Sequence, residues 1–223
     1  HRAPHATYNI WDDLPQIAEL LDRLGWADCV LMGHSRGANI SALFAAAMPE
    51  RVRALISLDS LAPQPAGEDA VATLRAFIEQ TRARKARPHR SFPTREAYLR
   101  RRVQKGNSAA VSEALADRAL EETPEGFRMR GDPRLFASSA IKLTRPQVEG
   151  VLRAIRCPVL NIWAEGSALR ARPAALDVAR LGAELIADYE MMELPGDHHF
   201  HLAPEAAAPM AHAILGFLAR RLA

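Results

Sequence analysis

The chain has 223 residues, of which 48% are hydrophobic and 25% are charged, and its formal net charge at neutral pH is +3. This composition is ordinary for a packed protein and excludes a disordered, collagen-like or low-complexity chain. No apolar run approaches the roughly 20 residues of a transmembrane helix, so we expect no membrane span. The chain starts at His1 without a signal peptide, and two cysteines are too few for a disulfide framework. We expect a cytoplasmic protein, and a targeting segment upstream of His1 is left open.

Helices and strands alternate at both ends of the chain. The continuous apolar run at 29–32 is typical of a strand that is covered on both faces. Strands separated by crossover helices predict an α/β fold, with a mostly parallel sheet and helices on both of its faces. The predicted strands cover residues 29–32, 52–58, 159–163 and 189–194. The predicted helices at the two ends cover residues 11–24, 38–48, 173–181 and 205–222.

The middle of the chain, residues 62–153, has a different character, because helical patterns dominate it. We expect a helical lid here, inserted into a core formed by residues 1–61 and 154–223. Basic residues concentrate between Arg75 and Lys105 and could attract an anionic substrate, but we favour a solvated helical face, and no nucleic-acid partner is expected. The predicted helices cover 69–86, 94–105, 108–121 and 145–154, with loops at 88–93 and 123–133.

A G-x-S-x-G pattern is formed by Gly33, His34, Ser35, Arg36 and Gly37. It follows a predicted strand and opens a predicted helix, which is the setting of a nucleophile elbow. The turn is so tight that Ser35 needs strained backbone angles, and the two glycines lack side chains that would collide. We therefore predict Ser35 as a nucleophile and the backbone N–H of Arg36 as an oxyanion donor. The alternative is a glycine-containing turn with a capping serine.

A serine hydroxyl needs a base to become a good nucleophile, and histidine is the usual one. The loop 195–201 contains three histidines and follows the last predicted strand, so it reaches the same sheet edge as Ser35. We predict His198 as the base, with His199 as the alternative, and expect His201 to cap or pack. An ordinary polar surface loop is the other interpretation. No metal is expected, because no second group of ligands stands at a fitting spacing.

The histidine also needs an acid that holds its tautomer. Two carboxylates stand at predicted strand ends. Asp59 ends the strand that follows the helix after Ser35, and Glu165 lies just past the third strand. Asp59 could also be an ordinary residue at a strand end, so both candidates are kept.

Together these residues resemble the α/β-hydrolase superfamily, through the stretches Leu31–Ala38 and Leu194–His198. Three further stretches resemble the serine-hydrolase-like proteins within it: 127–135, 157–160 and 198–202. The resemblance implies a serine hydrolase that cleaves an ester or related acyl substrate through an acyl-enzyme, without a cofactor. A thioester, lactone or amide would use the same triad. The rival hypothesis is a non-catalytic protein that binds a small molecule on the same fold.

The chain departs from the superfamily at two places. The superfamily most often carries its acid where this sequence has Ser167, which cannot serve, whereas many haloalkane dehalogenases carry it where this sequence has Asp59. This favours Asp59 over Glu165.

Superfamily members also have several strands before the elbow, and one loop there supplies a second oxyanion donor. Those strands are missing from this sequence, so we expect residues 1–223 alone to be inactive.

Overall fold

The structure, a computed structural model, describes residues 7–223. They divide into two compact units, and each is described here by itself. The core unit comprises residues 10–68, 142–201 and 205–223, and the insert unit comprises residues 69–141 with the short segments 7–9 and 202–204.

The core unit is built on a four-stranded sheet whose neighbouring strands are all parallel, as the sequence predicts. Its strands are β1 (Cys29–His34), β2 (Val52–Leu58), β6 (Val159–Ala164) and β7 (Tyr189–Leu194), in the order β1-β2-β6-β7. Strands β2 and β7 have the predicted bounds, while β1 and β6 run slightly further. Because the strands are parallel, their carboxyl ends meet at one edge of the sheet, where functional groups of α/β folds gather.

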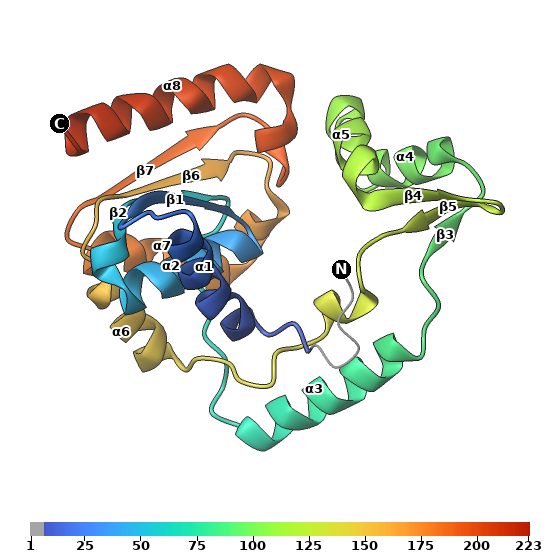
Figure 1. Ribbon diagram of the computed structural model, residues 1–223, viewed down its shortest axis with the longest axis horizontal. Coiled ribbons are helices and arrows are strands. Elements are labelled where there is room, and N and C mark those ends of the chain that lie inside the picture. The colour runs from blue at the N-terminus through green and yellow to red at the C-terminus, as the bar shows by residue number, and fades with distance from the viewer. Residues whose placement is uncertain (1–6) are drawn as a thin grey trace. The chain divides into compact units, whose positions relative to one another are not determined.

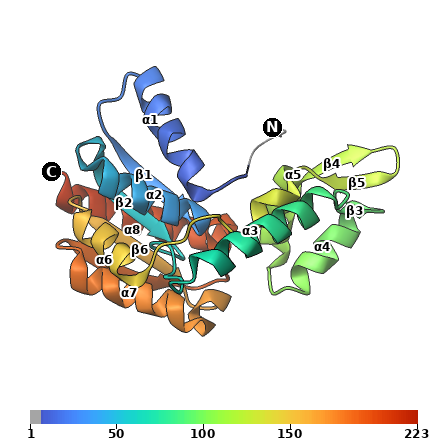
Figure 2. The same ribbon diagram turned by 90° about the horizontal axis from the view of Figure 1, so that it is seen from below.

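Helices cover both faces of this sheet, which confirms the prediction. The two views agree that α2, α6 and α7 lie on one face and α8 on the other (Figures 1 and 2). The helices of the core unit are α1 (Leu14–Arg23), α2 (Arg36–Ala47), α6 (Arg145–Ala154), α7 (Pro173–Leu185) and α8 (Pro204–Arg221). Short 3-10 helices of the two units cover Ile10–Asp13, Pro49–Arg51, Pro133–Phe136, Ala168–Ala171 and Phe200–Leu202. No helix within residues 7–223 is both long and apolar enough to cross a bilayer.

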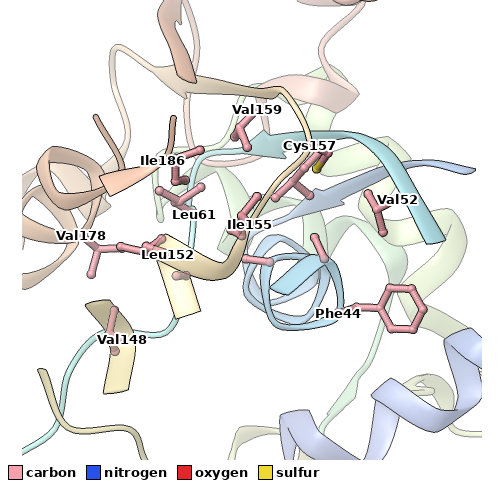
Figure 3. Packing of buried hydrophobic residues seen from close by; sticks show 14 of the residues in the cluster. Phe44, Val52, Leu61, Val148, Leu152, Ile155, Cys157, Val159, Val178 and Ile186 are labelled. Carbon is pink, nitrogen blue, oxygen red and sulfur yellow. The ribbon is translucent and has the colours of Figure 1, made fainter. Parts of the chain in front are cut away.

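The main hydrophobic core lies between the sheet and the helices α2, α6 and α7. Figure 3 shows Phe44 of α2, Leu152 of α6 and Val178 of α7 packed with Val52 and Val159 of the strands. Helix α6, which we placed in the predicted lid region, thus contributes to this core. The cluster holds the strands in place, and their ends position the polar groups described below.

Strand β1 corrects one prediction. Val30 and Met32 are 39% and 58% exposed, whereas Cys29 and Leu31 are half-buried. The expectation that residues 29–32 are covered on both faces is therefore wrong. In the sheet that the described residues form, β1 is an edge strand, and α2 packs against one of its faces.

The insert unit combines helices with a small sheet that the sequence analysis missed. Its helices are α3 (Ala70–Lys85), α4 (Arg95–Val103) and α5 (Ala109–Ala119). Its three antiparallel strands are β3 (Ser91–Phe92), β4 (Leu120–Thr123) and β5 (Gly126–Met129), in the order β3-β5-β4. The predicted loops at 88–93 and 123–133 are wrong where these strands lie. Strands of two to four residues are too short to show a periodic pattern.

Side-chain caps explain where the insert helices begin. Asp69, Thr94 and Ser108 each accept a hydrogen bond from a backbone N–H in the first turn of the following helix. Such caps satisfy N–H groups that have no partner within the helix. The predicted starts at 69, 94 and 108 are these capping residues.

Candidate active site

Ser35 lies in the turn between β1 and α2. Its backbone angles, φ 53° and ψ −115°, fall in a region that residues with a side chain rarely adopt. The backbone N–H of Ser35 donates to the carbonyl oxygen of Leu58 at 2.9 Å, which ties the turn to the end of β2. The strained turn places the serine at the N-terminus of α2 and at the carboxyl edge of the sheet, as a nucleophile elbow does.

The two glycines of the motif are not equivalent. A Cβ atom on Gly33 would lie 2.4 Å from the backbone carbon and oxygen of Gly37, whereas a Cβ on Gly37 would meet no atom within 4 Å. The expectation that both glycines avoid a collision is therefore wrong for Gly37. The close approach of strand and helix depends on Gly33.

Replacing Gly33 by alanine is expected to lower the free energy of unfolding by about 3 kcal/mol, because the backbone must move to admit the methyl group. Gly37→Ala is the matched control, and it should be neutral or stabilising by up to about 1 kcal/mol, since alanine is the better helix former. Urea unfolding of the two variants beside the wild type checks this. Equal stability of the two variants would contradict the close approach.

His198 lies in the loop after β7 and joins two of the candidate residues. Its Nε2 is 3.0 Å from Ser35 Oγ, and its Nδ1 is 2.5 Å from Asp59 Oδ2. A carboxylate can only accept, so Nδ1–H donates to Asp59. In the neutral ring Nε2 then carries the lone pair, and the Ser35 hydroxyl donates to it. The three side chains form one hydrogen-bonded chain.

Asp59 follows the last residue of β2, and its backbone has a positive φ of 49°. Its side chain is fully buried and accepts hydrogen bonds from His198, from the hydroxyl of Ser167 and from the backbone N–H of Ala164, the last at 3.0 Å. Burial alone would raise the pKa of Asp59, but these donors outweigh it and lower the pKa below its ordinary value. Asp59 is therefore a carboxylate at neutral pH.

The alternative residues lie outside this chain of hydrogen bonds. Glu165 is exposed, and its backbone N–H donates to the carbonyl oxygen of Leu194. His199 donates its backbone N–H to Asp197 at 2.6 Å, and its ring centroid is 5.0 Å from that of His198. The structure thus brings Asp59 rather than Glu165 to His198, and His198 rather than His199 to Ser35.

His34 has a contact that the sequence analysis did not anticipate. Its Nε2–H donates to the backbone carbonyl oxygen of His198 at 2.6 Å, and its ring centroid is 4.0 Å from that of His201. Burial, helped by the nearby His201 imidazole, lowers the pKa of His34 to about 3, so its ring is neutral. The sequence did contain a signal for this role. His34 is the residue directly before Ser35 in the G-x-S-x-G motif, so it lies at the same edge of the sheet.

Arg36 is the first residue of α2, so its backbone N–H lies at the positive end of the helix dipole. Its guanidinium binds Asp13 at 3.1 Å. Within residues 7–223, no cluster of three or more histidine, cysteine or acidic side chains has a geometry that could hold a metal ion. The chemistry available at this edge is that of a serine, a histidine and a carboxylate beside a helix N-terminus.

Comparisons with known proteins place the chain among related sequences. The sequence is similar to a serine hydrolase-like protein of Dictyostelium discoideum, with 27% identity over 93% of this chain and 60% of that protein. It is also similar to a probable serine hydrolase of Drosophila melanogaster, with 28% identity over 89% of this chain and 63% of that protein. The chain thus spans less than two thirds of the length of either relative.

A solved structure extends the likeness to the whole fold. A hypothetical protein of Pseudomonas aeruginosa matches with a TM-score of 0.88 and 32% identity, over 98% of this chain and 77% of that chain. Residues 1–202 also match the family described as alpha/beta hydrolase fold. This match covers most of the sequence, and the chain therefore belongs to the α/β-hydrolase family, in which it is similar to the serine hydrolase-like proteins.

Proposed function

We propose that the protein is a serine hydrolase that cleaves an ester or a related acyl substrate through an acyl-enzyme. The observation that supports this most is the hydrogen-bonded chain from the buried Asp59 through His198 to Ser35. The positive φ of Ser35 also supports the proposal. Strained backbone angles of this kind cluster at active sites, where the surrounding structure stabilises them.

In the proposed mechanism, each of these groups has one step. Ser35 Oγ attacks the acyl carbon while His198 Nε2 accepts its proton, and the backbone N–H of Arg36 stabilises the oxyanion that forms. His198 then gives the proton to the leaving group, which departs and leaves an ester on Ser35. His198 then takes a proton from a water molecule that attacks the acyl carbon, and it returns this proton to Ser35 Oγ as the acid leaves.

Asp59 and His34 both act on His198 during these steps. Asp59 is ionised and 2.5 Å from His198 Nδ1, so it stabilises the imidazolium and keeps the ring in the required tautomer. The neighbouring His34 ring is neutral, because its pKa is about 3, and therefore does not repel the positive charge on His198. His34 also fixes the loop by its hydrogen bond to the His198 carbonyl oxygen.

The proposed substrate is a small molecule with an acyl bond. Thioesters, lactones and amides remain within the proposal, because all of them pass through the same tetrahedral intermediate and acyl-enzyme. The basic residues between 75 and 105 could attract an anionic substrate, but a solvated helical face remains the favoured interpretation of their charge. The role of residues 62–153 as a lid stays a prediction.

A fluorophosphonate probe tests the proposal on the full-length protein. The probe reacts with an activated serine and forms a stable adduct, so we expect peptide mass spectrometry to find the adduct on Ser35. The same treatment of the His198→Ala variant should give no adduct, because the base that activates Ser35 is absent. A non-catalytic binding protein would leave Ser35 unlabelled in the wild type, and that result would overturn the proposed function.

A further inference from the structure

The Asp59 carboxylate lies at the end of strand β2 and accepts hydrogen bonds from the end of the neighbouring strand β6. It enters from the end of β2, yet two of its three hydrogen-bond donors come from the end of β6 and the turn that follows. The backbone N–H of Ala164 donates to Oδ1, while the hydroxyl of Ser167 donates to Oδ2. Oδ2 is also the oxygen that accepts Nδ1–H of His198. Ser167 thus binds the same oxygen that faces the histidine.

Ser167 is itself held by hydrogen bonds. Its side chain is buried, its backbone N–H donates to the carbonyl oxygen of Ala164 at 3.1 Å, and its Oγ accepts the backbone N–H of Leu169 at 3.2 Å. Because Oγ accepts from Leu169 and a carboxylate can only accept, the hydroxyl proton of Ser167 points at Asp59. The donor is therefore oriented before any substrate binds.

We propose that Ser167 is a positioning residue, which holds the Asp59 carboxylate in the orientation that receives His198. This inference rests on the proposed function, because it concerns the same three side chains. Both Asp59 and Ser167 are buried, so bulk water does not replace the hydroxyl when it is removed. Without it, Oδ2 keeps one donor instead of two, and the carboxylate is free to turn away from His198.

A purely structural role for Ser167 is the alternative, since its side chain also caps the 3-10 helix at Ala168–Ala171. The two roles differ in what they change. Loss of a cap lowers stability and leaves the catalytic rate constant of the folded protein intact, whereas loss of positioning lowers kcat and leaves KM unchanged.

The test compares Ser167→Ala with Ser167→Thr in the full-length protein, using a p-nitrophenyl ester at a temperature where both are folded. We expect kcat of Ser167→Ala to fall about ten-fold with KM unchanged, the loss that one hydrogen bond to a charged group supports. Ser167→Thr keeps the hydroxyl and should recover most of this loss.

Ser57→Ala is the matched control, because Ser57 is also buried and its Oγ has no hydrogen-bond partner among the described residues. Its kcat should be unchanged.

A second readout does not depend on turnover. The Nδ1 proton of His198, hydrogen-bonded to Asp59, should give a low-field proton resonance in the wild type, and Ser167→Ala should shift or broaden it while Ser57→Ala does not. If the wild type hydrolyses nothing but this resonance responds, the proposed function fails and the positioning stands. If Ser167→Ala changes neither kcat nor the resonance, or changes both no more than Ser57→Ala does, the positioning role is overturned.

Discussion

Replacing Ser35 by alanine is expected to lower kcat for a short p-nitrophenyl ester by about 10⁶-fold, because the acyl-enzyme can no longer form. The substitution removes one oxygen atom that lies 3.0 Å from His198 Nε2, and it leaves the hydrogen bond between Asp59 and His198 in place. The loss should therefore appear in kcat rather than in stability. Initial rates of wild type and variant, purified in parallel in their full-length forms, give the ratio.

Ser41→Ala is the matched control for this experiment. Ser41 lies on the same helix, α2, and is buried, but no hydrogen bond joins it to the triad residues. We expect its kcat to stay within about threefold of the wild type, as for a group outside the catalytic unit. A Ser35→Ala variant that kept more than a tenth of the wild-type turnover would show that the mechanism is wrong.

Asp59→Asn is expected to lower kcat by about 10³- to 10⁴-fold, the cost of losing control over the histidine tautomer. The carboxylate accepts hydrogen bonds on both oxygens, from Ala164 on Oδ1 and from His198 on Oδ2. An amide has one oxygen and one NH₂ group, so a donor would face a donor at one of these two contacts. The same rate assay measures the effect.

Glu165→Gln serves as the comparison for Asp59→Asn. Glu165 is exposed, and the hydrogen bond to His198 Nδ1 comes from Asp59, so this variant should lose less than about tenfold in kcat. The reverse ranking of the two variants would move the acid to Glu165. Two mild effects would argue against a conventional triad.

Much of the core unit could be predicted because its signals are local and long enough to read. The segments 52–58 and 189–194 are strands with the predicted bounds, and the alternation with helices correctly implied a parallel sheet. Parallel strands share one carboxyl edge, and this rule alone placed Ser35, Asp59 and the loop at 195–201 near one another. The structure then joined Asp59 and His198 by a hydrogen bond.

The features that the sequence did not reveal depend on contacts between distant segments. The exposure of Val30 and Met32 follows from the place of β1 at the edge of the described sheet, which an apolar run cannot report. The small sheet of the insert unit pairs strands of two to four residues. The donors from His34 and Ser167 reach residues more than 100 positions away in sequence. The G-x-S-x-G motif places His34 at the sheet edge, but it does not identify the residue that His34 binds.

The most direct test of the central claim, that Ser35 is acylated with help from His198 and Asp59, is to trap the covalent intermediate. The full-length protein is mixed with p-nitrophenyl acetate, quenched in acid within the first turnovers, and digested for peptide mass spectrometry. We predict an acetyl group on Ser35 in the wild type and none there in Ser35→Ala or His198→Ala protein. Steady hydrolysis by the wild type with the acetyl group on another residue, or with Ser35 unmodified at every quench time, would contradict the account.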